Sequence, residues 1–189
     1  MTLAGPVRLI VTGEIGQGKT RTCEAAAERL RDLGWEIAGV LSPAVWVGNQ
    51  KVAIDALDLR TGRTRRLAER AGAGHALAGP ATRSWRFDAE TIAWCNSLLA
   101  DAIDCDLLVV DELGPLEFES GDGLIQGVRA VDAGRFRLGL VVVRPRLLQP
   151  AQARWPTAAV LAIRELADSP ARVDQVLAIA GGTHAHPSG

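Results

Sequence analysis

The chain has 189 residues and a formal net charge of −1, with 21 Lys and Arg against 22 Asp and Glu. This balance argues against a protein dedicated to binding nucleic acids or anionic membranes, because both need a strong positive excess. Hydrophobic residues make up 48% of the chain and charged residues 23%, which excludes wholesale disorder. The length suits a single domain, which we expect to span residues 1–180, followed by a disordered tail over residues 181–189.

The cysteines and the apolar runs indicate where the protein works. Cys23, Cys95 and Cys105 form no CxxC pair and are odd in number, so we expect free thiols in a reducing compartment. The N-terminal apolar stretch is interrupted by Gly5 and Pro6, unlike a signal peptide, and no apolar run is long enough to span a bilayer. We therefore expect a cytoplasmic protein without membrane contact, and by default a monomer, since the chain has no apolar heptad pattern.

Strand and helix patterns alternate along the first half of the chain. An apolar, β-branched run that ends at a glycine predicts a buried strand, and apolar residues at helical spacing predict a helix after it. A Gly-Asn-Gln turn between two apolar runs predicts a hairpin. In chain order, these elements are a strand over residues 7–12, a helix over 18–33, a strand over 35–41 and hairpin strands over 45–47 and 52–59.

The second half continues this alternation. Residues 70–84 are rich in Gly, Ala, Pro and Thr and are expected to form a loop, and Asp88 is a good N-cap for the helix after it. The remaining elements are a helix over residues 88–102, a strand over 107–110, a helix over 123–133, strands over 138–143 and 158–163, and a final helix that begins at Ser169-Pro170. The alternation predicts an α/β layered fold with a mostly parallel sheet.

The strongest motif lies between the first strand and the first helix. It fits the pattern G-x-x-x-x-G-K-T of a phosphate-binding loop in full, and both flanking elements are those that the motif requires. Glycines let successive backbone N–H groups face one point, and the helix N-terminus adds a positive dipole there. We expect Lys19 to reach the β- and γ-phosphates, Thr20 to ligate Mg²⁺, and Arg21 to lie near the α-phosphate. The expected nucleotide-binding residues are Gly13, Glu14, Ile15, Gly16, Gln17, Gly18, Lys19, Thr20 and Arg21.

A second magnesium partner is expected at the end of another strand. The apolar residues 107–110 are followed directly by Asp111 and Glu112. Strand alternation would place these two carboxylates on opposite sides of the backbone and give them different roles. We expect Asp111 to hold Mg²⁺ and Glu112 to orient an attacking water, which favours hydrolysis over transfer to an alcohol. The alternative for Glu112 is an exposed carboxylate at a strand end or a partner of a helix cap.

The charge that develops during phosphoryl transfer is often stabilised by an arginine. We favour Arg144, because it follows the strand over residues 138–143 and the carboxyl ends of strands border the ligand crevice in open α/β sheets. Trp46 and Trp85 are candidates for stacking on a base, although large aromatic residues more often pack in cores. The segment 49–52 fails the N/T-K-x-D pattern that reads guanine, so the preferred base stays open.

Four segments together resemble a known family: VTGEIGQGKT (11–20), GVLSP (39–43), DALDLRTGRTRRLA (55–68) and DELGPLEF (111–118). They are similar to the P-loop nucleoside-triphosphatase family first described from thermophiles, which includes the human cancer-related nucleoside-triphosphatase. The resemblance implies a RecA/kinase-like, three-layer α/β fold with an inserted antiparallel hairpin in a mostly parallel sheet. It also implies slow, Mg²⁺-dependent hydrolysis of nucleoside triphosphates such as ATP and GTP to diphosphate and phosphate. Glu117 would then act on the metal site indirectly, through the groups that bind the metal, or else be a surface carboxylate in a turn.

Three functions follow as hypotheses. The leading one is an Mg²⁺-dependent nucleoside-triphosphatase in which Lys19, Glu112 and Arg144 are catalytic. The second is a small-molecule kinase in which the glycine-rich region before the second helix, with Arg83 and Arg86, closes over an acceptor. The third is a nucleotide-dependent binding or assembly factor in which slow hydrolysis resets a switch.

Overall fold

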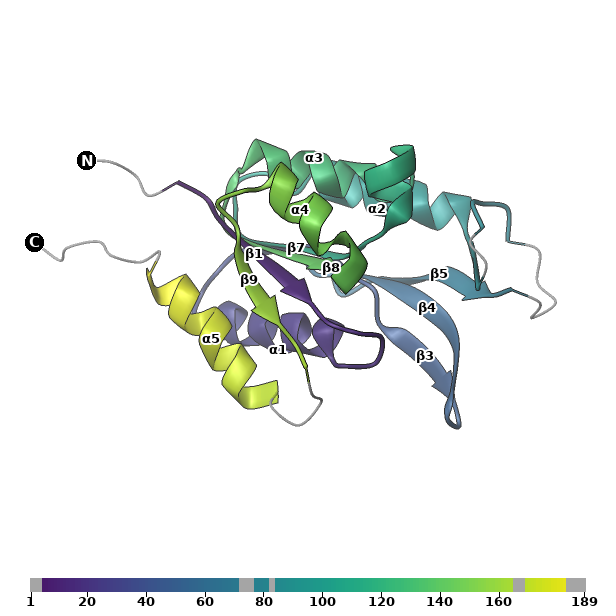
Figure 1. The fold of residues 1–189 in the computed structure, drawn as a ribbon, viewed down its shortest axis with the longest axis horizontal. Coiled ribbons are helices and arrows are strands. Elements are labelled where there is room, and N and C mark those ends of the chain that lie inside the picture. The colour runs from purple at the N-terminus through teal and green to yellow at the C-terminus, as the bar shows by residue number, and fades with distance from the viewer. Residues whose placement is uncertain (1–4, 72–76, 82–83, 165–168, 183–189) are drawn as a thin grey trace, which may run out of the picture.

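The computed structural model describes residues 5–71, 77–81, 84–164 and 169–182. Within these ranges, nine strands form one sheet in the order β6-β5-β4-β2-β7-β8-β1-β9, with β3 attached to β4. The parallel half of the sheet comprises β1 (Val7–Thr12), β2 (Ile37–Leu41), β7 (Cys105–Leu113), β8 (Phe136–Val143) and β9 (Ala159–Ala162). Figure 1 shows these strands at the centre of the molecule, as the α/β prediction requires.

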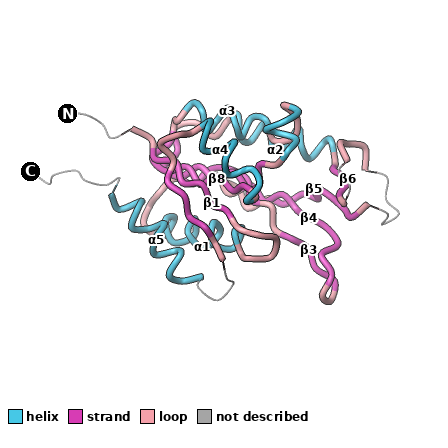
Figure 2. The backbone as a smooth tube through the Cα atoms, in the orientation of Figure 1, coloured by secondary structure: helices cyan, strands magenta, loops and turns pink. Residues whose placement is uncertain are grey.

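Helices cover both faces of the parallel strands. On one face lie α1 (Lys19–Asp32) and α5 (Ser169–Gly182), and on the other lie α2 (Ala89–Ala100), α3 (Ile125–Ala133) and α4 (Leu148–Arg154) (Figures 1 and 2). Alternate residues of a strand enter the two cores. In β7, Leu107 and Val109 join the core under α1 and α5, whereas Leu108 and Val110 join the core under α2 and α3. Burial on both faces explains why these strands are continuous apolar runs, and it confirms the three-layer fold.

Four antiparallel strands continue the sheet beyond β2, and we call them the antiparallel extension. They are β3 (Ala44–Val47), β4 (Gln50–Asp58), β5 (Thr64–Arg70) and β6 (Trp85–Phe87). The β3–β4 hairpin was predicted, whereas β5 and β6 were not. In β5 only Leu67 and Ala68 are buried among charged residues, so no apolar run marks the strand. The extension is therefore larger than the expected hairpin.

Three short helical segments were also missed: α4, a 3₁₀ turn over Pro145–Leu147 before it, and a single π-helical turn over Leu116–Ser120. Pro150 lies inside α4, but it is the third residue of the helix, where its missing N–H group is not needed. As predicted, Asp88 caps α2 and accepts a hydrogen bond from the N–H of Thr91 at 2.8 Å. The final helix runs to Gly182, past the expected boundary at residue 180, and residues 183–189 lie outside the described ones.

The helices in the described ranges include none that is both long and apolar enough to cross a membrane.

Gly39 of β2 lies beside Val109 of β7 in the sheet. Its φ is 118°, and a Cβ atom there would lie 2.0 Å from the backbone oxygen of Val109. We expect Gly39→Ala to lower the free energy of unfolding by about 3 kcal/mol or more, because overpacking and backbone strain act together. Urea denaturation measures this loss.

Gly48→Ala is the matched control for this substitution. Gly48 also has a positive φ, of 58°, but a Cβ atom there meets no other atom within 4 Å. Its loss should be about 1 kcal/mol, the cost of the left-handed conformation alone. Equal losses in the two variants would contradict the close approach of β2 to β7.

Candidate active site

The loop that the sequence predicts to bind phosphate, which we call the phosphate-binding loop, joins β1 to α1. A Cβ atom at Gly13 would lie 2.5 Å from the backbone oxygen of Ile163, so only glycine lets the chain after β9 pack this closely. The side-chain oxygen of Gln17 accepts a hydrogen bond from the N–H of Glu14 at 2.6 Å. The Gln17 amide donates to the carbonyl of Arg164 at 2.8 Å. Gln17 therefore fixes the loop against the segment that follows β9.

Lys19 is the first residue of α1, directly after the loop, and its side chain is only 7% exposed. Its ammonium donates to the carbonyl of Gly13 at 2.7 Å and to that of Glu14 at 2.9 Å. It also lies 4.0 Å from Oε2 of Glu112. The backbone of the loop thus positions the cation, whereas Ile15 at the tip of the loop is exposed to solvent.

Asp111 is almost fully buried at the end of β7. Its carboxylate accepts a hydrogen bond from the N–H of Ser42 at 3.1 Å and is also hydrogen-bonded to the side chain of Thr20. The Ser42 hydroxyl donates to the backbone carbonyl of Asp111. Burial, and next the charge of Glu112, raise the pKa of Asp111 to about 6. The two expected ligands of Mg²⁺, Thr20 and Asp111, are therefore in contact.

Glu112 forms an ion pair with Arg144, whose Nε lies 2.5 Å from Oε1 of Glu112. The strand order explains the pair. In the sheet, β8 lies between β1 and β7. Arg144, which directly follows β8, therefore lies between the phosphate-binding loop after β1 and the acids at the end of β7. Glu112 is therefore part of a charged cluster with Arg144 and Lys19, rather than a solvated carboxylate at a strand end.

The two carboxylates have different partners, as their predicted separation by strand alternation requires, but both lie near the phosphate-binding loop. Asp111 bonds to Thr20, and Glu112 lies near Lys19. The register between β7 and β8 shifts within the last residues of β7, where both acids lie. The two acids are thus close enough for the charge of Glu112 to act on Asp111.

Glu117 joins the two ends of the segment that follows β7 through hydrogen bonds to its backbone. Its Oε2 accepts a hydrogen bond from the N–H of Gly114 at 2.6 Å, and its Oε1 accepts one from the N–H of Leu124 at 2.7 Å. Burial raises the pKa of Glu117, although these two hydrogen bonds oppose the shift. Glu117 is therefore not a surface carboxylate, and both of its oxygens bind the backbone of its own loop.

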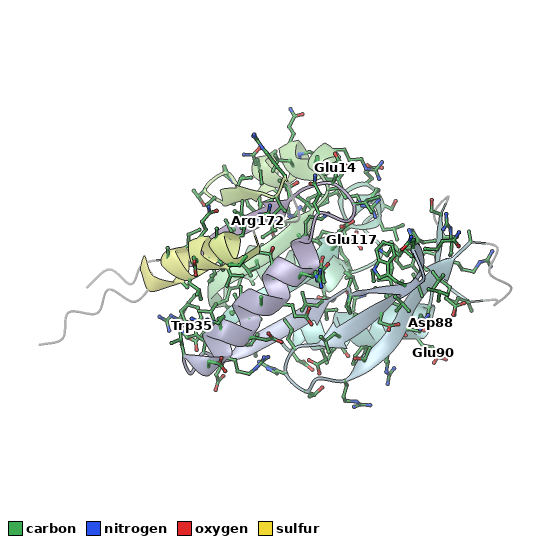
Figure 3. All side chains as sticks on the ribbon, turned by 90° about the horizontal axis from the view of Figure 1, so that it is seen from below. Glu14, Trp35, Asp88, Glu90, Glu117 and Arg172 are labelled. Atoms are coloured by element: carbon green, nitrogen blue, oxygen red, sulfur yellow. The ribbon has the colours of Figure 1, made fainter. Side chains whose placement is uncertain are left out.

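A groove of about 570 Å³ begins at the phosphate-binding loop and runs along α1 beside α5. Gly18, the exposed Arg21 and Ala25 line it from α1 and the loop, and Arg172 lines it from α5. Figure 3 shows Arg172 on α5, beside α1. The hydroxyl of Thr22, which also lines the groove, is buried and has no hydrogen-bond partner among the described residues. A groove of this size is large enough for a small organic ligand.

Sequence reasoning missed two residues that belong to this region. Ser42 follows β2, and only the order of the strands reveals that β2 lies beside β7. Lys51, on β4, is the second of two lysines in the chain, and its rarity among many arginines was the available signal. The charges of Asp111 and Glu112 act on its ammonium.

Of the residues considered for a lid and for base stacking, Arg86, Trp46 and Trp85 do not line the groove along α1. Arg86 is part of β6 and pairs with Glu69 across the sheet, and Arg83 lies outside the described residues. Trp46 is 54% exposed on β3. Trp85 lies on β6, under the ammonium of Lys51. The lid prediction for Arg86 was therefore wrong, because that residue belongs to the sheet.

The donor set at Thr20 and Asp111 fits Mg²⁺. Hydroxyl and carboxylate oxygens are ligands that Mg²⁺ prefers, and proteins usually bind it with one or two carboxylates together with phosphate oxygens and water. In the part of the chain that the structure describes, no three His, Cys, Asp or Glu residues gather into a metal-binding group. Thr20 and Asp111 would thus hold the ion together with a bound phosphate.

Comparisons with known proteins place these residues in a wider context. The chain matches the model of the NTPase family over residues 8–151. It is 31% identical to the nucleoside-triphosphatase THEP1 of Methanosarcina barkeri over 127 residues, which are 66% of this chain and 70% of that protein. It is 30% identical to the nucleoside-triphosphatase THEP1 of Pyrococcus abyssi over 119 residues, which are 62% of this chain and 64% of that protein.

Two solved structures share the fold. The solution structure of a human cancer-related nucleoside triphosphatase superposes with a TM-score of 0.69 at 19% identity, over 95% of this chain and 98% of that one. The crystal structure of THEP1 from the hyperthermophile Aquifex aeolicus superposes with a TM-score of 0.68 at 16% identity, over 92% of this chain and 99% of that one. At these identities the likeness concerns the fold alone.

Replacing the Asp111 carboxylate by an amide should stabilise the protein when nucleotide and Mg²⁺ are left out. The pKa of Asp111 is raised to about 6 in the folded protein, so the folded state binds a proton more tightly than the unfolded state, whose value is near 3.9. Stability therefore falls as the pH rises from about 4 to about 6, and the full penalty remains above that range.

We accordingly expect Asp111→Asn to raise the free energy of unfolding near pH 7 by on the order of 1–3 kcal/mol. The variant should also lose the pH dependence between about pH 4 and 6. Urea denaturation over this range provides the measurement. A variant that is less stable than the wild type near neutral pH would show that the buried carboxylate is compensated.

Proposed function

The chain belongs to the NTPase family, and we propose that it hydrolyses nucleoside triphosphates, ATP and GTP among them, to diphosphate and phosphate with Mg²⁺ as cofactor. The observation that carries this proposal is the convergence of Lys19, Glu112 and Arg144 beside the Thr20–Asp111 pair. The first three offer two cations and a carboxylate, which are the groups that bind phosphates and accept a proton from water.

Lys19 and the backbone of the phosphate-binding loop hold the substrate. The ammonium of Lys19 is directed by two carbonyls of the loop, and it is a compact charge that suits the β- and γ-phosphates. Thr20 and Asp111 bind Mg²⁺, which when present neutralises charge on the phosphates. These contacts account for binding and orientation, the two contributions on which phosphoryl transfer mainly depends.

Glu112 and Arg144 act on the attacking water. The water oxygen forms a bond to the γ-phosphorus, its proton passes to the carboxylate of Glu112, and the bond from the γ-phosphorus to the diphosphate oxygen breaks. The ion pair with Arg144 fixes the orientation of the Glu112 carboxylate. We also assign to Arg144 the stabilisation of the charge that develops on the transferred group.

The groove between α1 and α5 is the proposed site of the nucleoside. It begins at Gly18, next to the phosphates, and Arg21 at its start suits the α-phosphate. The carboxylates of Glu24 and Glu28 and the guanidinium of Arg172 also line the groove and are polar groups that a sugar or a base can contact.

Hydrolysis is favoured over transfer to an alcohol acceptor. The kinase hypothesis depended on arginines in a closing segment, and Arg86 belongs instead to β6. Glu112, in contrast, lies next to the loop lysine, where a base for water is needed.

Replacing Glu112 by glutamine should separate binding from turnover. The amide keeps the shape of the side chain but does not accept the proton, so turnover should fall at least about a hundredfold while nucleotide affinity changes little. Phosphate release from ATP and GTP with Mg²⁺ measures the first quantity, and calorimetry measures the second.

Two further variants complete this experiment. Glu119→Gln removes an exposed carboxylate near the same strand end and should leave turnover unchanged. Lys19→Ala should abolish both binding and turnover. Unchanged turnover in Glu112→Gln would remove Glu112 from the mechanism, and absent phosphate release in the wild type would contradict the proposed activity.

Filling the groove should weaken binding of nucleotides but not of bare phosphate chains. Ala25→Leu adds bulk on the groove side of α1, and we expect it to weaken binding of a nucleoside triphosphate at least about tenfold, since the nucleoside needs that space. Tripolyphosphate, which lacks a nucleoside, should bind equally well to the variant and the wild type. Arg29→Leu, on an exposed side of α1, is the control. Parallel losses for both ligands would place the nucleoside elsewhere.

A further inference from the structure

Lys51 belongs to the antiparallel extension, on the hairpin that begins beside the Ser42–Asp111 hydrogen bond. It lies on β4, opposite Trp46 of β3, in a hairpin whose first strand begins two residues after Ser42. Its side chain is half-buried, and its ammonium lies 5.1 Å from the centroid of the Trp85 ring. An ammonium over an aromatic face is attracted by the ring, so this side chain has a defined position instead of extending into solvent.

The charges that act on Lys51 are those of the active site. The carboxylates of Glu112 and Asp111 attract its ammonium. The cations of Arg144 and Lys19 repel it. Burial lowers the pKa of Lys51, and the two carboxylates oppose that shift. Lys51 therefore shares its electrostatic surroundings with every charged member of the cluster described above.

The backbone sets the position of Lys51 relative to the acidic strand end. The N–H of Ser42 donates to the Asp111 carboxylate, and β3 begins just after this residue. The N–H of Asp55 on β4 donates to the carbonyl of Pro43 at 3.0 Å, which ties β4 to the start of the hairpin. A functional group on a strand fixed in this way is held more precisely than one on a loop.

We propose that Lys51 binds the terminal phosphate of the nucleoside triphosphate, as a third cation that the antiparallel extension supplies. The proposal rests on the function proposed above. Lys19, Arg144 and Lys51 together outnumber the carboxylates of Asp111 and Glu112 by one, so the cluster favours an anion between them. A lysine on a flexible stem suits this task, because it reaches a phosphate as a compact point charge.

The proposed contact distinguishes triphosphates from diphosphates. Lys19 and the loop backbone bind the phosphates that both nucleotides share, whereas the group that Lys51 binds is absent from a diphosphate. Lys51 is therefore expected to contribute to triphosphate affinity and to turnover, and to contribute little to diphosphate affinity.

Three variants of the full chain test this expectation. Lys51→Met removes the charge and keeps the length of the side chain, and Lys51→Arg keeps the charge. Arg65→Met is the matched control, because Arg65 lies on β5 of the same extension with its guanidinium 4.8 Å from the centroid of the Trp94 ring. The Arg65→Met variant loses a cation–aromatic contact like that of Lys51, but no charge of the cluster.

Calorimetry with Mg²⁺ compares a non-hydrolysable ATP analogue with ADP, and phosphate release from ATP gives turnover. Lys51→Met should weaken binding of the analogue about tenfold and reduce turnover about tenfold to a hundredfold, with ADP affinity changed less than about twofold. Lys51→Arg should restore most of both losses. Arg65→Met should match the wild type.

Two results would overturn the proposal. One is a Lys51→Met variant that behaves like Arg65→Met in both assays. The other is an equal loss of affinity for the analogue and for ADP. That result would mean that Lys51 binds the phosphates that both nucleotides share, or that it only stabilises the fold. The binding ratio remains informative even if the wild type releases no phosphate, so failure of the proposed hydrolysis is distinguishable from failure of the Lys51 contact.

Discussion

The position of β8 between β1 and β7 is the constraint on which the active site depends. Parallel strands end at the same edge of a sheet, and the register places Val143 of β8 beside Thr12 of β1 and Leu113 of β7. The phosphate-binding loop, Arg144 and the two acids therefore leave the sheet at neighbouring points. The two cores that hold these strands, one on each face, are thus what fixes the geometry of the charged cluster.

Each charge of this cluster has a different kind of compensation. Lys19 is held by backbone carbonyls, and Glu112 by the guanidinium of Arg144. Asp111, the most deeply buried, has hydrogen-bond donors as its direct partners and the like charge of Glu112 nearby. Burial of a charge is unfavourable unless a partner offsets it, and dipoles offset less than an opposite charge does. Asp111 is therefore the position at which the proposed cation would offset the largest cost of burial.

The features that could be predicted from the sequence are those that residues close together in the chain determine. The phosphate-binding loop, the acids after an apolar strand and the cap at Asp88 each depend on about ten neighbouring residues. The place of Arg144 at the carboxyl edge of the sheet could also be predicted, because parallel strands end at the same edge. Its ion pair with Glu112 could not, because that pair depends on the order of the strands. The hydrogen bonds of Glu117 to the backbone depend on the path of the loop after β7. The contact of Lys51 with Trp85 depends on how four antiparallel strands are arranged. One of these, β5, carries charged residues where an apolar pattern would have marked it.

The antiparallel extension joins the parallel strands through a narrow connection. β2 pairs with β4 only at Val40–Asp58 and Leu41–Leu57, and the contact then continues through Ser42, whose N–H and hydroxyl both bind Asp111. Hydrogen bonds to an ionised carboxylate are stronger than those to a neutral group. The charge on Asp111 thus strengthens the bond that holds the start of the hairpin, and the same hairpin carries Lys51. The residue expected to hold the metal thus binds the start of the hairpin that carries the cation proposed for the terminal phosphate.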